Sequence, residues 1–542
     1  MVCVTLLALI VGARTFLPDL LRPDLFKDDA CQHIWWTYRF GDPALFPNDP
    51  ILTFFSDPAQ APCGWRWLYR LLVPLVDAQV LSEVISALLA IPTVVLIFLA
   101  GKRAYRADGA RDAGAALLAG VTAATWMLAR NDLGFVSGGF PRSFALPILL
   151  LGLWALMAQR GAWLGVAFLL GALFYPPVVV NLGLVAAVVW AVQLARQRRL
   201  PAGWPALLTL GAAALAIIMW VYARPTPPEI GPHVTAAEAR AMPEFGLSGR
   251  SRFFVNDPVA FYIAQPRSGL QWKPWALALT AALVAGSAVA FRRAVPFEVW
   301  ALLGTSLFGF ALAHLTLFAL YLPSRYVKYT LPVFLWLWLA AVLPRALAAL
   351  ERWSWGQRLR GALRQGPVLI TLAVLVLGVE TARTTRTLYK ELSTPPSADR
   401  EKLFAFLATL PKATLVAAHP MDADEIPLRS RRSVLASRES AQPYFPRYYA
   451  RIAERIAAEL MACYASDWKD VDALRDRYGV EVFVANAQRY RHLWPYFAPF
   501  TEATQRQIER GCREGFVLQN PPADRVLFRS GDYAVVRVGP AS

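Results

Sequence analysis

The chain has 542 residues, of which 56% are hydrophobic and only 17% are charged, and its formal net charge is +17. Soluble domains carry roughly 25% charged residues, so this composition excludes a set of ordinary soluble domains. The positive charge does not indicate nucleic-acid binding, because no DNA- or RNA-binding signature accompanies it and many basic residues fall in short loops between apolar runs.

Long apolar runs occupy the first 382 residues, and a membrane-spanning helix needs roughly 20 apolar residues. Candidate spans lie at 1–17, 80–100, 113–130, 143–158, 161–174, 177–195, 206–223, 273–290, 299–320, 329–348 and 367–382. The first lacks a basic n-region and a clear cleavage site, so we expect an uncleaved anchor. A proline pair at Pro176-Pro177 would break a single helix over 161–195. We predict a polytopic α-helical membrane protein of about eleven spans, with a transmembrane domain over 1–382.

The short basic loops all lie on one side of the membrane if the N-terminus is cytoplasmic, as the positive-inside rule requires. The outer side then receives a long first loop at 18–79, shorter loops at 131–142, 224–272 and 321–328, and the C-terminal region. We therefore expect a multi-pass protein of the bacterial inner (cytoplasmic) membrane whose C-terminal domain is periplasmic.

An acidic pair, Asp28 and Asp29, opens the helix-compatible stretch 28–40 of the first outer loop. Adjacent residues on a helix point about 100° apart, so one acid can face a cavity while the other caps the helix. The two acids are either capping residues or include a general base or metal ligand at the membrane surface, and we favour the second interpretation. His33 would share the face of Asp29, as part of an Asp–His pair or as a structural residue.

Two further outer loops carry cations. In one, Gly138-Gly139-Phe-Pro precedes Arg142 at a helix start, which is either a phosphate cradle or a flexible loop with a snorkelling arginine. The turn 321–328 places Arg325 and Lys328 on the outer surface, against the positive-inside bias. Something anionic is expected there, either a lipid headgroup or a lipid-linked phosphate substrate, and we favour the substrate.

The C-terminal part alternates helical and strand patterns and predicts a periplasmic α/β domain over 397–542, joined to the membrane domain by a linker at 383–396. Helices are expected at Leu403–Leu410, Tyr448–Cys463 and Asp470–Tyr478, and strands at Ala413–Ala418, Val480–Ala485, Val526–Phe528 and Tyr533–Val538. The five cysteines show no CxxC spacing, which argues against a zinc site. The pairs Cys31/Cys63 and Cys463/Cys512 are either disulfides or free thiols.

A first span, an outer loop with Lys27-Asp28-Asp29, the Phe-Pro-Arg142 loop, the Pro323-Ser-Arg325-Tyr326 turn and an outward C-terminal domain resemble the GT-C superfamily of integral-membrane glycosyltransferases. The resemblance implies a polyprenyl-phosphate-sugar donor, an unidentified glycan or lipid acceptor, and a first-loop acid as catalytic base. By the same resemblance, the base is Asp28 or Asp29. The residues that bind the substrate and its phosphate are His33, Arg142, Arg325, Tyr326 and Lys328. It assigns no metal ligand and leaves the need for a divalent cation open.

The sequence lacks a Trp-Trp-Asp motif of the kind that marks oligosaccharyltransferases, so transfer to a protein asparagine is not expected. An alternative function is a transporter or flippase of a lipid or polysaccharide precursor, and another is a non-catalytic scaffold. A transporter would place charged residues in the middle of its spans and would show repeated halves; the sequence has few of the former and no clear repeat.

Overall fold

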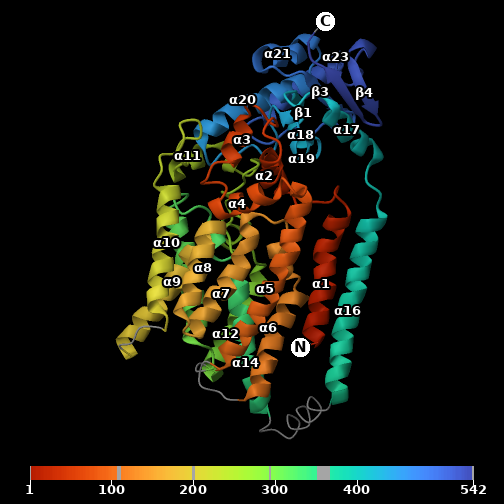
Figure 1. The fold of residues 1–542 in the computed structure, drawn as a ribbon. Coiled ribbons are helices and arrows are strands. Elements are labelled where there is room, and N and C mark those ends of the chain that lie inside the picture. The colour runs from red at the N-terminus through yellow and green to blue at the C-terminus, as the bar shows by residue number, and fades with distance from the viewer. Residues whose placement is uncertain (1, 107–111, 198–201, 292–293, 351–365, 540–542) are drawn as a thin grey trace.

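The computed structural model describes residues 2–106, 112–197, 202–291, 294–350 and 366–539. Long helices run side by side, and the sheet lies with several helices at one end of them (Figure 1). The loops 107–111, 198–201, 292–293 and 351–365, which hold many of the basic residues that predict the orientation, lie outside the described residues.

The long apolar helices form where the sequence predicts them. They are α1 (Val2–Leu21), α5 (Ala78–Arg106), α6 (Ala113–Ala129), α7 (Ala145–Met157), α8 (Gly161–Phe174), α9 (Pro176–Gln197), α10 (Trp204–Tyr222), α12 (Pro274–Phe291), α13 (Phe297–Leu315), α14 (Thr330–Leu350) and α16 (Gly366–Ser393). The expected break at Tyr175 separates α8 from α9. Within the described residues, seven helices are long and apolar enough to cross a membrane, and α6, α7 and α8 belong to shorter apolar helices. The prediction of a polytopic helical membrane protein is confirmed, while the number of spans stays a prediction.

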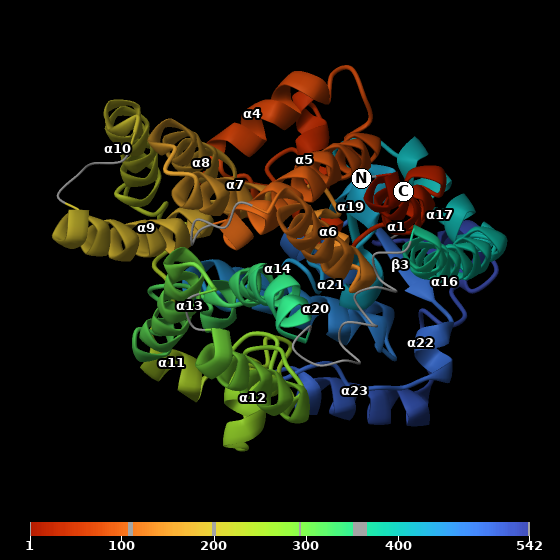
Figure 2. The same cartoon turned by 90° about the horizontal axis from the view of Figure 1, so that it is seen from below.

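The helix surfaces are apolar on both sides. In α5, Leu81 and Ile85 are buried, whereas Leu88 and Ile91 are exposed. A helix that is apolar all round suits a lipid environment, because its buried apolar side chains pack against other helices and its exposed ones contact lipid. Seen along the helices, α8, α9 and α10 lie together on one side and α1 lies beside α16 on the other (Figure 2). An ion pair of 2.7 Å between Arg14 and Glu380 joins these last two helices.

Short helices fill the loops on the side of the sheet. The first loop holds α2 (Ala30–His33), η1 (Trp35–Phe40), α3 (Pro50–Phe55) and α4 (Cys63–Leu72), and the others hold η2 (Asp132–Val136), η3 (Pro141–Phe144), α11 (Ala236–Ala241), η4 (Pro243–Phe245), η5 (Ala260–Ala264) and η6 (Pro323–Tyr326). The helical prediction for 28–40 is therefore largely confirmed. In α4, Trp65 is buried while Trp67 and Leu71 are exposed, the two-faced pattern of a helix at a membrane interface.

The C-terminal region is the expected α/β structure. Its helices are α17 (Ala398–Thr409), α18 (Pro420–Ala423), α19 (Ile426–Ser430), α20 (Pro446–Cys463), α21 (Trp468–Tyr478), α22 (Gln488–Arg491), α23 (Thr501–Glu514) and η7 (Ala523–Arg525), and its strands are β1 (Leu415–Ala418), β2 (Ser433–Val434), β3 (Val482–Asn486), β4 (Val526–Ser530) and β5 (Tyr533–Arg537). The strand order is β2-β1-β3-β5-β4, with β1 parallel to both neighbours and β5 antiparallel to both of its own.

Most of the expected linker at 383–396 is helical, because α16 continues to Ser393 and α17 begins at Ala398. The division of the chain into domains stays a prediction. The first loop is nevertheless packed into the C-terminal region: the ring of Phe54 in α3 stacks on Tyr448 of α20 at 4.0 Å and meets Phe445 edge-on at 5.0 Å. The two segments share one apolar core.

This shared core predicts a large stability effect at Phe54. We expect Phe54→Ala to lower the free energy of unfolding by about 3–5 kcal/mol, because it leaves a cavity between α3 and α20. Thermal unfolding of the purified protein in detergent, followed by tryptophan fluorescence, measures the loss as a lower Tm. Trp494, which is 76% exposed, provides the control: Trp494→Ala should change stability by no more than about 0.5 kcal/mol. Equal effects of the two substitutions would contradict the shared core.

Candidate functional site

The two adjacent acids point to different partners. Asp29 forms a 2.6 Å ion pair with Arg142, and its side chain is 26% exposed. Asp28 accepts a hydrogen bond of 3.0 Å from Arg438 of the C-terminal region, and its side chain is 72% exposed. Asp29 stands at the N-cap of α2 but makes no side-chain capping bond. The expected divergence is confirmed, and the capping interpretation is wrong for Asp29.

Close packing of the loop that contains Gly138 and Gly139 determines the position of Arg142. The carbonyl of Gly139 accepts hydrogen bonds from the indole of Trp65 (2.8 Å) and the hydroxyl of Tyr69 (3.1 Å), both in α4. Gly139 has a φ of +60°, and a Cβ there would lie 2.5 Å from the carbonyl oxygen of Ser82, so only glycine fits. The loop is thus fixed against α4 and α5, and η3 carries Arg142 to Asp29.

Arg325 and Lys328 complete a group of charges that we call the cation cluster: Asp29, Arg142, Arg325 and Lys328. Both cations act electrostatically on Asp29. The guanidinium of Arg325 lies 5.7 Å from the ring centroid of Tyr321, and its Nε is buried without a hydrogen-bond partner among the described residues. A buried N–H without a hydrogen-bond partner is energetically costly, so the guanidinium of Arg325 is suited to an anionic ligand.

The electrostatics of Asp29 follow from this cluster. Burial opposes its ionisation, but the neighbouring positive groups, Arg142 first and then His33, Arg325 and Lys328, outweigh burial and lower the pKa of Asp29 below its ordinary value. Burial lowers the pKa of His33 to about 4, so its imidazole is neutral near pH 7. His33 lies beside the cluster, with its ring centroid 5.7 Å from that of Phe140.

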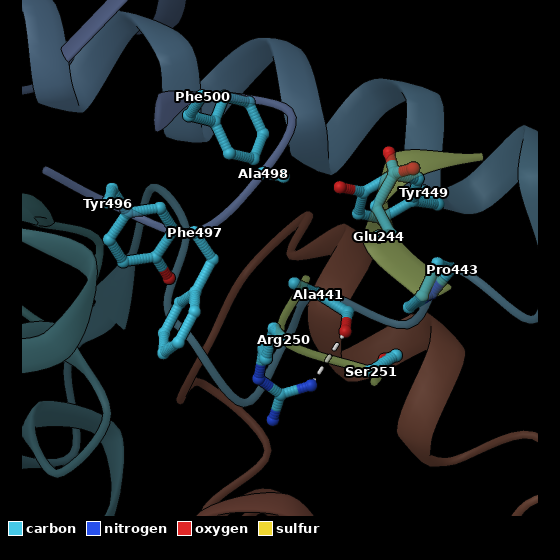
Figure 3. A pocket seen from close by; sticks show the side chains of 10 residues that line it. All are labelled: Glu244, Arg250, Ser251, Ala441, Pro443, Tyr449, Tyr496, Phe497, Ala498 and Phe500. Atoms are coloured by element: carbon cyan, nitrogen blue, oxygen red, sulfur yellow. Dashed lines mark hydrogen bonds between the residues drawn. The ribbon is translucent and has the colours of Figure 1, made fainter. Parts of the chain in front are cut away.

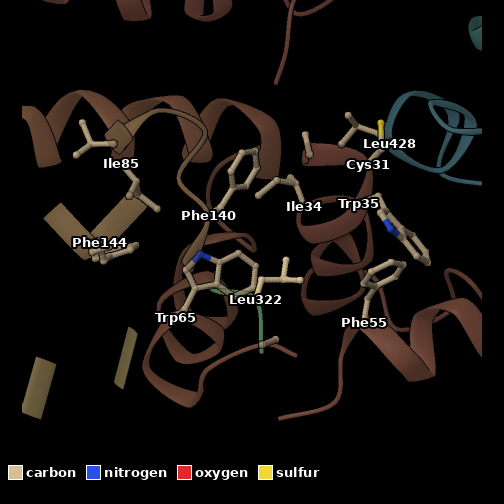
Figure 4. Close-up of a cluster of buried hydrophobic side chains, with 14 of the residues drawn as sticks. Cys31, Ile34, Trp35, Phe55, Trp65, Ile85, Phe140, Phe144, Leu322 and Leu428 are labelled. Carbon is tan, nitrogen blue, oxygen red and sulfur yellow. The ribbon is translucent and has the colours of Figure 1, made fainter. Parts of the chain in front are cut away.

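An apolar cluster holds the segments that carry these charges. Figure 4 shows Ile34, Phe140, Trp65 and Leu322 gathered between α2, α4 and the segments before η3 and η6. All four are buried. Ile34, Phe140 and Leu322 each lie within a few residues of a member of the cation cluster, and Trp65 contacts the loop before Arg142. The packing of these four side chains therefore fixes the charges relative to one another.

Tyr326, the remaining expected binding residue, faces elsewhere. Its hydroxyl donates a 3.2 Å hydrogen bond to the carbonyl of Leu320, and the space beside its ring exists because residue 309 is a glycine. The structure therefore brings together Asp29, His33 and the three cations, and gives Tyr326 a packing contact with α13.

Sequence reasoning missed a second charged network, on the far side of α2. Arg438 contacts Asp28, Asp424 and Glu439, and Arg250 pairs with Glu439 at 2.7 Å. Burial, followed by the neighbouring Glu439, raises the pKa of Asp424 to about 7. No local pattern could reveal this network, since its members come from three segments separated by hundreds of residues.

Arg250 also lines a pocket between the loop 224–272 and the C-terminal region (Figure 3). Three of the polar atoms that line it are buried without hydrogen-bond partners among the described residues, on Glu244, Ser251 and Tyr496. The pocket has a volume of about 10 Å³, room for about one water molecule and far too little for a sugar. It is therefore suited to a bridging water rather than to a substrate.

The described residues contain no group of three or more His, Cys, Asp or Glu side chains that could hold a metal ion. All five cysteines are free thiols in the structure. His419, after β1, accepts a hydrogen bond from the backbone of Met421 at the start of α18, and Asp422 pairs with Arg489 at 2.6 Å. These residues stabilise the C-terminal region internally.

No protein-family model and no curated protein matches the chain. Among solved structures, it is similar to the oligosaccharyltransferase of Archaeoglobus fulgidus tethered to an acceptor peptide, with 14% identity over 94% of this chain and 71% of that one and a TM-score of 0.44. It is also similar to the same organism's oligosaccharyltransferase AglB in complex with an inhibitory peptide and a dolichol-phosphate, with 13% identity, coverage of 90% and 69%, and a TM-score of 0.43.

The raised pKa of Asp424 predicts a pH-dependent stability. The folded chain keeps a proton on Asp424 that the unfolded chain releases above about pH 4, so this group makes folding less favourable as pH rises from about 4 to 7. We expect Asp424→Asn to reduce the fall in Tm between pH 5 and pH 8, by an amount equivalent to about 1–3 kcal/mol.

Asp472 is the matched control, because its pairing with Arg525 lowers its pKa despite burial and its contribution is lost only at lower pH. Asp472→Asn should leave the slope between pH 5 and pH 8 unchanged. Parallel Tm profiles for the wild type and Asp424→Asn would contradict the assignment to Asp424.

Proposed function

We propose that the chain is a membrane glycosyltransferase that transfers a sugar from a polyprenyl-phosphate donor to a hydroxyl of a glycan or lipid acceptor, with Asp29 as the base. The observation that carries the proposal is the cation cluster, in which one carboxylate stands among three cations. One of these cations, Arg325, has a buried N–H with no hydrogen-bond partner in the part of the chain that the structure describes. Arg142, Arg325 and Lys328 would hold the donor phosphate.

The charges of the cluster match such a reaction. It holds two more positive than negative charges. A polyprenyl-phosphate sugar is a phosphodiester with one negative charge, and the polyprenyl phosphate that leaves carries up to two. The cluster would therefore stabilise the leaving group more strongly than the donor, which is the condition for catalysis.

In the proposed step, the acceptor oxygen forms a bond to the anomeric carbon as the bond from that carbon to the phosphate oxygen breaks. The acceptor proton passes to Asp29, and the electron pair of the broken bond stays on the phosphate. This single displacement inverts the anomeric centre. One carboxylate suffices because a phosphate leaves without protonation, unlike the sugar oxygen that a glycosidase must protonate.

The location follows from the expected orientation. With a cytoplasmic N-terminus, the cluster and the C-terminal region lie on the periplasmic face of a bacterial inner membrane. Asp28 is not the base in this proposal, because its carboxylate faces Arg438 instead of the cation cluster.

The two adjacent acids provide a matched test. We expect Asp29→Asn to lower kcat by about 10²–10⁴-fold, the usual contribution of a general base, while Asp28→Asn retains at least a tenth of the activity. Activity is measured with the protein purified with native lipids, as release of polyprenyl phosphate from radiolabelled polyprenyl-phosphate sugars. Full activity of Asp29→Asn would exclude Asp29 as the base.

Arg325 should act on the donor. We expect Arg325→Gln to weaken binding of farnesyl phosphate, a short polyprenyl phosphate, by about 10–100-fold, since a charged hydrogen-bonding group is removed from a buried site. Titration in detergent, followed by tryptophan fluorescence, measures the Kd. Arg400, which pairs with Glu425 in the C-terminal region, is the control: Arg400→Gln should leave the Kd unchanged.

Movement of labelled donor across vesicles without sugar transfer would favour a flippase instead.

A further inference from the structure

We propose that Glu439 and Arg438 of the C-terminal region are positioning residues for Asp29, acting through Gln32 and Asp28. This inference rests on the proposed function, because it takes Asp29 as the base. It gives the C-terminal region a role in alignment of the catalytic group.

Both contacts are made on the short helix that carries Asp29. The side-chain amide of Gln32 donates a hydrogen bond to Oε2 of Glu439. Arg438 donates to Oδ1 of Asp28 at 3.0 Å. One contact lies immediately before Asp29 and the other three residues after it, so the C-terminal region holds α2 on both sides of the base.

The two positioning residues are themselves fixed. The backbone N–H of Glu439 donates a hydrogen bond to Oδ1 of Asp424 at 2.7 Å. Nε of Arg438 donates to Oδ2 of the same aspartate at 3.0 Å. Arg250 pairs with the Glu439 carboxylate at 2.7 Å and donates to the carbonyl of Ala441 at 2.9 Å. Glu439 is buried. A charge network anchored near the end of β1 therefore presents fixed partners to α2.

α2 needs such support. It has four residues, and a helix this short has no independent stability in water. Asp29 makes no capping bond that would fix its own side chain to the helix. A misplacement of about 1 Å can cost about 10²-fold in rate, so the external contacts decide how well the base is aligned.

The same segment of the C-terminal region also reaches the phosphate-binding side. The hydroxyl of Tyr444 accepts a 2.9 Å hydrogen bond from Arg267, whose carbonyl accepts one of 3.3 Å from the backbone of Ser324, next to Arg325. Residues 438–444 thus connect the helix of the base with the turn that carries a phosphate-binding cation.

The test separates alignment from folding. Gln32→Leu removes the amide and leaves the C-terminal network intact. We expect it to lower kcat by about 10–100-fold, with the Kd for farnesyl phosphate within twofold of the wild type and an unchanged Tm. Hydrogen exchange of the peptide covering 28–34 should be faster in this variant. Asp472→Asn, which breaks an ion pair elsewhere in the C-terminal region, should change neither kcat nor this exchange.

An exchange of partners provides the rescue. Gln32→Glu alone sets two carboxylates against each other and should lower kcat at least as much as Gln32→Leu does, and the double variant Gln32→Glu/Glu439→Gln restores one donor and one acceptor and should recover at least tenfold. A kcat of Gln32→Leu within twofold of the wild type, or a double variant no faster than the slower single one, would overturn the positioning role. Because Asp29→Asn tests the base independently, either result would leave the proposed function standing, whereas an active Asp29→Asn would remove both.

Discussion

Three cations crowded around one carboxylate repel one another, and the packing beneath them is the constraint on which the site depends. Arg142 and Arg325 come from loops almost two hundred residues apart, and among the described residues only Arg142 of the three cations forms a direct ion pair, with Asp29. Like charges in a partly dehydrated place are unfavourable unless the surrounding structure holds them. The buried side chains of Ile34, Phe140, Trp65 and Leu322 supply that structure. The excess positive charge is then available to an anion.

The packing on which the site depends extends into the C-terminal region. The ring of Phe54 contacts the rings of Phe445 and Tyr448, and ion pairs such as Lys412–Asp42 and Arg431–Asp77 cross the same boundary. Surface ion pairs contribute little stability, so the shared aromatic core holds the two parts together and the ion pairs fix their orientation. A first outer loop packed in this way moves only as far as the C-terminal region moves with it.

The sequence predicted what depends on local pattern. Apolar runs placed each long apolar helix that the structure describes, the proline pair placed the break before α9, and helix geometry predicted that Asp28 and Asp29 diverge. The cations of the outer loops were recognisable because they oppose the usual charge distribution. The missed features are short, polar or non-local: β2 has two residues, α23 is a polar helix without an apolar run, and Glu439 contacts Gln32 across 407 positions. Tyr326 was grouped with its charged neighbours, although in η6 its side chain turns towards α13.

The proposal that Asp29 is the base raises one chemical difficulty, since the cations that lower the pKa of Asp29 also weaken it as a proton acceptor. The donor resolves this difficulty in the proposed mechanism. A phosphate bound to Arg325, Lys328 and Arg142 neutralises the field that these cations exert on Asp29, and the pKa of the carboxylate rises. Proton transfer from the acceptor becomes favourable only after the donor has bound, and the charge that develops on the departing phosphate raises the basicity of Asp29 further as the bond breaks. In the proposed mechanism, the clustering that makes Asp29 a poor base in the free protein therefore couples its activation to the presence of the sugar donor.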